Sequence, residues 1–219
     1  MMTSKGLGLN SFQLKWIAII TMLIDHVGAI LFPTQIGFRI IGRFSFPIFC
    51  FLLVEGFHHT RNVKKYMVRL GLFALISEIP YDLAFRHVFL EFQRQNVFFT
   101  LLLGMVLMYM LQRTNRIYIK GCYILLSMWF ALVAGMSYDY RGILLILIYY
   151  TCRKNITAKI VCGAAWNILW TGVQQFGALA SIPIALYNGE KGRSMKYVFY
   201  VFYPVHLLIL YFISSILMG

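Results

Sequence analysis

Residues 16–32, WIAIITMLIDHVGAILF, form an apolar run with two ionisable side chains, Asp25 and His26, near its middle. A helix of this length comes close to crossing the roughly 30 Å of hydrocarbon in a bilayer. No small-residue cleavage pattern follows the run, so we expect a retained membrane span rather than a cleaved signal peptide. An ionisable group at the bilayer centre costs about 2.5–3.5 kcal/mol, so Asp25 and His26 each need a partner or a function.

The composition of the whole chain is typical of a membrane protein. Of the 219 residues, 60% are apolar, 12% are charged and 17% are aromatic. This balance leaves no segment for a separate soluble domain. The net charge of +13 would suggest nucleic acid in a soluble protein, but the basic residues lie mainly in short loops between apolar runs. They therefore indicate membrane topology, and no nucleic-acid partner is expected.

Further apolar runs predict an all-α fold, a polytopic integral membrane helical bundle with about nine transmembrane helices in a single domain, residues 1–219. The predicted spans are Trp16 to Phe32, Phe44 to Phe57, Tyr66 to Phe85, Val97 to Leu111, Ile117 to Met136, Tyr140 to Thr151, Ile156 to Thr171, Phe176 to Tyr187 and Tyr197 to Met218. Apolar periodicity supports each of them. The sixth and eighth are short for full spans. Half-helices, tilted pieces or buried segments that do not face lipid are alternatives for them, so eight or ten crossings are alternatives to nine.

The positions of Lys and Arg predict the orientation of this bundle. With nine spans, fifteen of the 20 basic residues fall on one side of the membrane. The other side has five, which are Arg39, Arg43, Arg86, Arg94 and Arg141. Because cytoplasmic loops are enriched in Lys and Arg, we expect a cytoplasmic N-terminus and an outer C-terminus.

Asp25 and His26 are the first candidate site residues. Consecutive helix residues point about 100° apart, so the two side chains cannot share one direction. The simplest alternative to a functional site is that Asp25 pairs with a neighbouring arginine and that His26 forms a hydrogen bond across helices. Otherwise, His26 is the candidate for the chemistry and Asp25 the residue that orients it.

More polar residues than one ion pair requires are predicted at middle to outer depth. They are Arg43, Glu78, Asp82, Asn96, Asp139, Arg141 and His206. Histidine is the usual proton carrier near neutral pH, so this set indicates a functional site within the membrane.

A basic cluster follows the second predicted span. It consists of Arg61, Lys64, Lys65 and Arg69. These residues fit contact with anionic membrane lipid, and the alternative is a dock for a phosphorylated cytosolic donor. The sequence has no zinc-binding or nucleotide-binding motif, so no metal is expected.

Seven polar motifs, in order, resemble those of the TraX family of membrane proteins in the form found in Gram-positive bacteria. They are LIDH at 23–26, GRFSFPIF at 42–49, EGF at 55–57, SEIPYD at 77–82, NVFFT at 96–100, YDY at 138–140 and FYPVHL at 202–207. The resemblance covers nearly the whole chain and implies a multi-pass protein of the bacterial cytoplasmic membrane.

The resemblance also implies an activity, since the founding TraX protein is associated with N-acetylation of the amino terminus of conjugative pilin. By that analogy, acetyl-CoA is the donor and His26 is a general base or a transient acyl acceptor. Asp25 and Arg43 hold the charge balance of the site, and His206 is a second proton-handling group. The acyl acceptor need not be pilin, and the candidates are a peptide amine, a protein N-terminus, a sugar or an envelope polymer.

Two other classes of function compete with acyl transfer. In a proton-coupled transporter, the same acids and histidines would form a proton or ion relay. Transporters often contain repeated halves, and no internal repeat is found in this chain. An assembly or scaffold protein is a third class, but it gives no role to ionisable side chains within the membrane.

Overall fold

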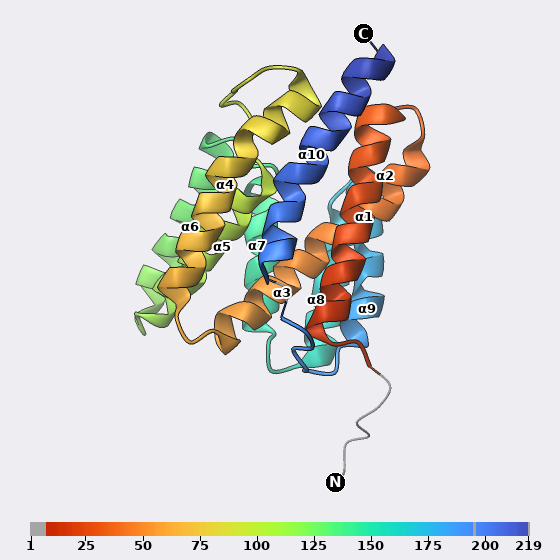
Figure 1. Ribbon diagram of the computed structural model, residues 1–219. Coiled ribbons are helices and arrows are strands. Elements are labelled where there is room, and N and C mark those ends of the chain that lie inside the picture. Colours follow the sequence, from red (N-terminus) through yellow and green to blue (C-terminus); the bar gives the residue numbers. More distant parts are fainter. Residues whose placement is uncertain (1–7, 195, 219) are drawn as a thin grey trace. The chain divides into compact units, whose positions relative to one another are not determined.

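The computed structural model describes residues 8–194 and 196–218, which fold almost entirely as helices (Figure 1). In chain order they are α1 (Ser11–Leu31), α2 (Ile36–Gly42), α3 (Ser45–His59), α4 (Val63–Arg86), α5 (Val97–Gln112), α6 (Ile117–Val133), α7 (Asp139–Thr151), α8 (Ile156–Leu169), the 3-10 helix η1 (Gly172–Ala180), α9 (Ser181–Ala185) and α10 (Lys196–Met218). Extended pairing in these residues is limited to two isolated bridges. The predicted all-α class is confirmed.

Helix α1 begins five residues before the predicted span, because a capping signal precedes the apolar run. The Asn10 side chain accepts a hydrogen bond from the Gln13 backbone N–H, and the Gln13 side chain accepts one from the Asn10 N–H. This reciprocal arrangement satisfies two donors that a helix start otherwise leaves unpaired. Asp25 and His26 therefore lie in the last two turns of a 21-residue helix.

The structure departs from a series of continuous predicted spans in two places. The segment between Pro33 and Arg43, expected as a loop, contains the short helix α2. The predicted span Phe176 to Tyr187 is not one continuous α-helix, since its first part belongs to η1 and its second part to the five-residue helix α9. Both segments contain glycine, which weakens the periodic apolar signal of a helix.

Three helical segments among the described residues are long and apolar enough to cross a membrane. They are Ser11–Leu31, Ile36–His59, which joins α2 and α3, and Tyr197–Leu217. Helices α5, α6 and α8 are apolar but shorter than 18 residues. The number of crossings is thus not fixed by helix length and composition.

The helices divide into two compact units. The first unit contains residues up to 52 and residues 152–202, with α1, α2, the first half of α3, α8, η1 and α9. Its α1 and α2 pack closely because Gly28 has no side chain. A Cβ atom at this position would lie only 2.1 Å from the Cβ of Phe38. Leu14, Phe46 and Ile184 are fully buried in its core.

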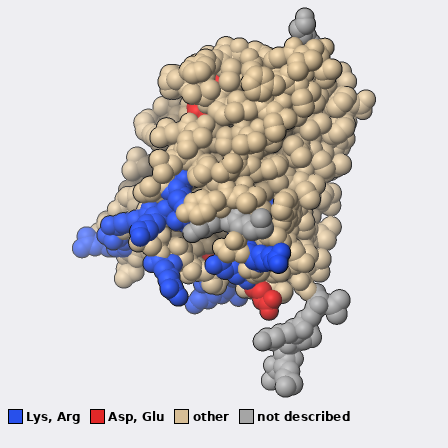
Figure 2. Space-filling view, viewed as in Figure 1, with Lys and Arg blue, Asp and Glu red and all other residues tan. Residues whose placement is uncertain are grey.

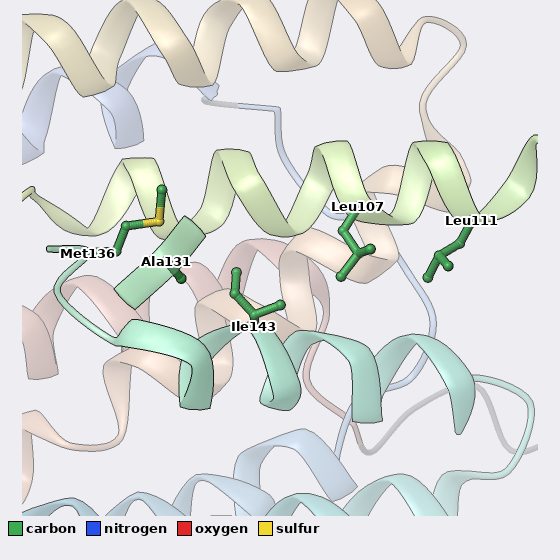
Figure 3. Packing of buried hydrophobic residues seen from close by; sticks show 5 residues of the cluster. All are labelled: Leu107, Leu111, Ala131, Met136 and Ile143. Carbon is green, nitrogen blue, oxygen red and sulfur yellow. The ribbon is translucent and has the colours of Figure 1, made fainter. Parts of the chain in front are cut away.

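The second unit contains residues 53–151 and 203–219, with α4, α5, α6, α7 and most of α10. Side chains from α5, α6, α7 and the α6–α7 loop form a hydrophobic cluster in this unit (Figure 3). The cluster consists of Leu107, Leu111, Ala131, Met136 and Ile143. Gly104 lets α5 approach α7, since a Cβ atom there would lie 2.4 Å from Ile146 Cδ1.

Candidate functional site

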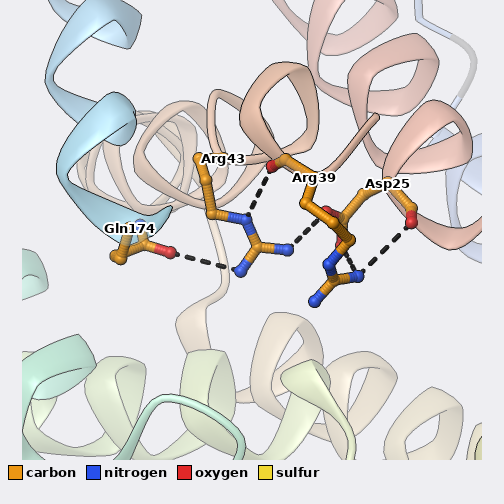
Figure 4. A network of polar contacts seen from close by, with 4 residues as sticks. All are labelled: Asp25, Arg39, Arg43 and Gln174. Carbon is orange, nitrogen blue, oxygen red and sulfur yellow. Dashed lines mark hydrogen bonds and ion pairs between the residues drawn. The ribbon is translucent and has the colours of Figure 1, made fainter. Parts of the chain in front are cut away.

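In the first unit, Asp25 forms ion pairs with two arginines of the α2 segment (Figure 4). Arg43 Nη2 donates to Asp25 Oδ1. Arg39 Nη1 donates to Asp25 Oδ2 at 3.0 Å and to the Asp25 backbone oxygen at 3.3 Å. Both carboxylate oxygens are therefore held by guanidinium groups, although Asp25 is only 7% exposed.

The polar network continues from Arg43 toward α8. Arg43 Nη1 donates to Gln174 Oε1 at 3.4 Å, and Gln174 Nε2 donates to Asn167 Oδ1 at 3.2 Å. Asn167 in turn donates to the Gly163 backbone oxygen at 2.8 Å. Because Gln174 and Asn167 are buried, these bonds give polar groups the partners that burial demands and fix the position of Arg43.

Glycine at position 42 allows this network to form. A Cβ atom there would lie 2.2 Å from both Cβ and Oδ1 of Asp25. Contacts under about 3 Å between such atoms are repulsive, so any larger residue would push α2 away from α1. Gly177 has a similar role beside Asn167, whose Oδ1 would lie 2.5 Å from an added Cβ atom.

The geometry gives Asp25 and His26, the two adjacent ionisable residues of α1, different chemical roles. Asp25, with each oxygen accepting from an arginine, is a fixed charge and a poor general base. His26 follows it on the helix and is 9% exposed, so its imidazole lies in a largely dry environment. A buried histidine is suited to proton transfer.

In the second unit, Glu78 and Asn96 contact each other. Glu78 Oε2 accepts from the Asn96 backbone N–H at 3.2 Å and from its side-chain amide. The same amide donates to the Ala74 backbone oxygen at 2.7 Å, and Asn96 Oδ1 caps α5 by accepting from the Phe98 N–H at 3.0 Å. Asn96 therefore joins the start of α5 to α4, and both polar side chains are buried.

Asp82 lies one turn after Glu78 on α4 and holds the loop that follows the helix. Its Oδ2 accepts from the Glu91 backbone N–H at 2.7 Å. The Glu91 carboxylate forms an ion pair with Arg86. Asp82 is thus a structural anchor for the α4–α5 loop as well as a buried acid.

Asp139 and Arg141 lie in the first turn of α7. Asp139 has a left-handed backbone, with φ of 39°, and its Oδ1 accepts from the Arg141 N–H at 2.7 Å. The Arg141 guanidinium contacts the hydroxyl of Tyr140, with Nε 3.4 Å from the oxygen. These contacts of Asp139 and Arg141 lie within the first turn of α7.

His206 is buried in α10, with 4% of its surface exposed. Its ring lies 5.6 Å from that of Tyr203, and the Tyr203 ring packs edge-on against Phe98 at 5.0 Å. These distances join ring centroids. The aromatic neighbours hold the imidazole in an apolar environment within the second unit.

The basic cluster lies at the start of α4. Arg61, Lys64 and Lys65 are exposed, whereas the Arg69 guanidinium lies over the Tyr66 ring, 5.3 Å from its centroid. Figure 2 shows Lys and Arg side chains gathered where α4 begins, and the surface over the later turns of this helix is almost entirely tan. Such a cluster can attract phosphate groups of lipids or of a soluble ligand.

The structure therefore brings together Asp25 with Arg43, and Glu78 with Asn96, among the residues singled out from the sequence. It also adds Arg39, Gln174 and Asn167 to the network around Asp25. Arg39 has one sequence signal, because it lies four residues before Arg43 and so shares its helix face. Nothing in the sequence pattern marks Gln174 or Asn167. Among the described residues, no group of three or more His, Cys, Asp and Glu side chains has the geometry to hold a metal ion.

Comparison with known protein families identifies the chain's relatives. The family model described as TraX protein matches residues 11–214. The chain belongs to the TraX family. A probable fimbrial assembly protein FimC, serogroup H1, of Dichelobacter nodosus is 33% identical over 241 residues, covering 94% of this chain and 96% of the relative.

A second relative is an uncharacterized protein of Rickettsia prowazekii (strain Madrid E). It is 29% identical over 153 residues, which cover 68% of this chain and 58% of the relative. No solved structure is significantly similar to the chain. The network around Asp25 includes Gly42 and Arg43, which belong to the GRFSFPIF motif that resembles the TraX family.

Proposed function

We propose that this TraX protein is an integral membrane acyltransferase that moves an acetyl group from acetyl-CoA to an amine. The acceptor is a peptide, a protein N-terminus or another envelope molecule. The observation that carries the proposal is a buried histidine, His26, that directly follows in the sequence a carboxylate fixed by two arginines, in a chain of the TraX family. The relative named as a fimbrial assembly protein supports a role in modifying surface proteins.

The proposed location is the bacterial cytoplasmic membrane, which the chain crosses as one membrane domain of about nine spans. Three long apolar helices support this location. Large apolar side chains are also exposed along α4 and α10, among them Leu75, Ile76, Ile209 and Phe212. Exposed apolar side chains of this density are stable against lipid, whereas they would be an aggregation hazard in water.

In the proposed reaction, His26 acts as the general base. Its imidazole takes a proton from the acceptor amine while the amine nitrogen forms a bond to the thioester carbonyl carbon. The carbon–sulfur bond then breaks, and the proton passes to the departing thiolate of coenzyme A. In the alternative route, an imidazole nitrogen of His26 attacks the thioester carbonyl and the thiolate of coenzyme A leaves. The amine then attacks the acyl-imidazole, its proton passes to the thiolate, and the bond between the imidazole nitrogen and the acyl carbon breaks to restore His26.

The charged residues around His26 have supporting roles in this proposal. Asp25 maintains the charge balance of the site through Arg39 and Arg43. Arg43 is also the proposed donor to the oxyanion that develops on the carbonyl. His206 is the second proton-handling group.

The two substrates use further side chains. The proposed contacts to the acceptor are Glu78, Asp82, Asn96, Asp139 and Arg141. Arg61, Lys64, Lys65 and Arg69 are proposed to bind the phosphates of acetyl-CoA from the cytoplasm, and they also contact membrane lipids. The mechanism needs no metal ion and no nucleic acid.

A proton-coupled transporter is the second candidate function. It is favoured by two buried oxygens in the second unit, Glu78 Oε1 and Asp82 Oδ1, which have no hydrogen-bond partner among the described residues. Buried carboxylates of this kind, together with His206, are suited to carrying protons through a membrane.

One reconstitution distinguishes the two candidates. Purified protein in liposomes is given acetyl-CoA labelled in the acetyl group together with a membrane extract as the source of acceptor. An acyltransferase releases coenzyme A thiol and transfers label to a component of the extract. Absence of both, together with proton movement reported by a pH-sensitive dye inside the liposomes, would establish the transporter instead.

A further inference from the structure

In the first unit, the segment that leads into α10 is fixed to the start of α1 (Figure 1). The Leu9 N–H donates to the Leu186 backbone oxygen at 2.7 Å, and the Leu9 oxygen accepts from the Asn188 N–H at 2.9 Å. The Ser11 N–H donates to the Glu190 backbone oxygen at 2.8 Å. Because these three bonds join backbone atoms, they hold the chain around Glu190 beside the first turn of α1.

These contacts place the side chain of Lys191 near that of Lys15. The chain passes so close to α1 that a Cβ atom at Gly192 would lie 2.9 Å from the Cβ of Phe12. The Lys191 ammonium lies near enough to that of Lys15 for the two positive charges to repel each other. Lys15 is partly buried, and Lys191 and Glu190 are exposed. The fold therefore holds two like charges together at this end of the unit.

Three aromatic rings lie beside Lys15. Phe12, Trp16 and Phe199 contact one another edge-on, with ring centroids between 5.8 and 6.2 Å apart. The Lys15 Nζ lies 5.5 Å from the centroid of the Phe199 ring. The face of a ring attracts an ammonium group but does not neutralise its charge. No carboxylate of the described residues forms an ion pair with Lys15 or Lys191.

An apolar stripe leads from Lys15 along α1. Phe12, Trp16 and Ile20 follow one another at intervals of four residues and so share one face of the helix. Trp16 is 37% exposed and Ile20 is 51% exposed. Ile20 lies about 6 Å farther along the helix axis than Trp16. Two ammonium groups at one end of an exposed apolar stripe match an amphiphile that has an anionic head and a hydrocarbon tail.

We propose that Lys15 and Lys191 bind the phosphate of an anionic phospholipid, whose acyl chains lie along Trp16 and Ile20. A soluble phosphate compound fits less well, because it leaves the apolar stripe uncovered. In the proposed topology this end of α1 faces the cytoplasmic leaflet, whose anionic lipids attract basic side chains. The lipid site goes beyond the proposed function and does not depend on it.

The competing account is a general role at the membrane surface. In that account the lysines extend toward water and the rings belong to an aromatic belt, so any phospholipid contacts them equally. The two accounts differ in head-group selectivity. Only a lipid site prefers an anionic phospholipid to a zwitterionic one with the same acyl chains, and only there does removal of a lysine weaken the preference.

The fluorescence of Trp16 tests the proposal, because this side chain lies within the site. Purified full-length protein in detergent is titrated with phosphatidylglycerol or phosphatidylcholine that carries bromine on its acyl chains, since bromine quenches nearby tryptophan. The part of the quenching that a Trp16→Phe variant lacks belongs to Trp16. In the wild type, phosphatidylglycerol is expected to quench Trp16 at a concentration about tenfold lower than phosphatidylcholine.

Lys191→Gln is expected to raise the concentration of phosphatidylglycerol that quenches Trp16 by about fivefold. Lys154→Gln is the matched control, since it removes another exposed lysine of the same unit and should leave the titration unchanged. Both variants are measured with and without Trp16→Phe. An unchanged titration in Lys191→Gln, or equal quenching by the two lipids in the wild type, would overturn the proposal.

A second measurement needs no variant and covers the case in which a substituted protein fails to fold. Wild-type protein is treated with an N-hydroxysuccinimide ester, which modifies lysine amines, and labelled positions are read by mass spectrometry. Phosphatidylglycerol is expected to protect Lys15 and Lys191 and to leave the labelling of Lys154 unchanged, whereas phosphatidylcholine protects none of them. Equal labelling of Lys191 in the two lipids contradicts the proposal.

Soluble phosphates distinguish a lipid from another phosphate ligand. Inorganic phosphate and acetyl-CoA, each added at constant ionic strength, are expected to leave the quenching of Trp16 by brominated phosphatidylglycerol unchanged. Displacement of the lipid by either compound would identify a site for a soluble phosphate and overturn the lipid proposal. None of these measurements requires acyl transfer, so failure of the lipid site and failure of the proposed enzyme activity are distinguishable.

Discussion

At the scale of single residues, Asp25 shows how a charge is kept inside an apolar helix. Its two oxygens accept from Arg39 and Arg43, and Gln174 holds Arg43 in turn. A buried ion pair adds little net stability compared with apolar packing, but removing one partner leaves a buried charge without compensation. The main role of Asp25 in this network is therefore to hold the Arg39 and Arg43 side chains in position.

The pairing of Asp25 with an arginine could be anticipated from the sequence, because an acid at this depth needs a cation. The i, i+4 spacing of Arg39 and Arg43 is a signal only if the segment between them is helical, and the segment after Pro33 was expected as a loop. Gln174 lies 131 residues after Arg43 in the sequence. Contacts of that separation depend on packing between helices, which a single sequence does not specify.

Asp25→Asn is predicted to destabilise the protein by roughly 3–5 kcal/mol, because the largely enclosed Arg43 guanidinium and the partly exposed Arg39 guanidinium both lose their carboxylate. Thermal unfolding of the purified protein in detergent measures the effect. Glu190→Gln is the matched control, since it makes the same acid-to-amide change at an exposed position of the same unit and should change stability little. Equal stability of the two variants would argue against the network.

At the scale of secondary structure, the short helix α2 sets the geometry of the site. It places Arg39 one turn before Arg43, and Gly42 lets it approach α1. The long helices could be predicted from apolar periodicity, and several of their ends agree closely with the structure, such as the start of α5 at Val97. The seven-residue α2 is too short to be predicted from apolar periodicity, which is read over windows of more than ten residues. Its glycines near both ends and its polar neighbours weaken the helical signal further.

Gly42→Ala is predicted to cost about 1–3 kcal/mol or more, because the added methyl group would overlap with Asp25. Gly37→Ala is the matched control in the same helix. Nothing lies within 4 Å of a Cβ atom at Gly37, so this change should be neutral or stabilising by up to about 1 kcal/mol. Opposite signs of the two changes in Tm are expected, and a loss in both variants would show that the α1–α2 contact is not the cause.

At the scale of the whole molecule, each compact unit is assembled from two separate stretches of the chain. Residues up to 52 join residues 152–202, and residues 53–151 join residues 203–219. The sequence predicts one domain of helices, because periodicity and loop lengths describe neighbours along the chain and not which distant helices pack together. Charge bias, in contrast, is a property of the entire chain and predicts an orientation that can be tested directly.

Cysteine labelling in intact cells tests the proposed topology. In a background with the four native cysteines replaced by serine, Gln93→Cys is predicted to react with a membrane-impermeant maleimide added outside. Asn115→Cys is predicted to react only after the cells are permeabilised. Both positions are exposed in loops of the second unit. Labelling of Asn115→Cys from outside, with Gln93→Cys protected, would reverse the orientation.

The most direct test of the central claim compares transfer of labelled acetyl groups from acetyl-CoA by wild type, His26→Ala and His87→Asn in equal amounts. His87 is an exposed histidine with φ of 57°, a conformation that asparagine tolerates, so its variant is a histidine control without backbone strain. We predict that His26→Ala loses transfer by about 100-fold or more, as expected for removal of a general base, while His87→Asn keeps the wild-type rate. Wild-type transfer by a folded His26→Ala protein would contradict the account.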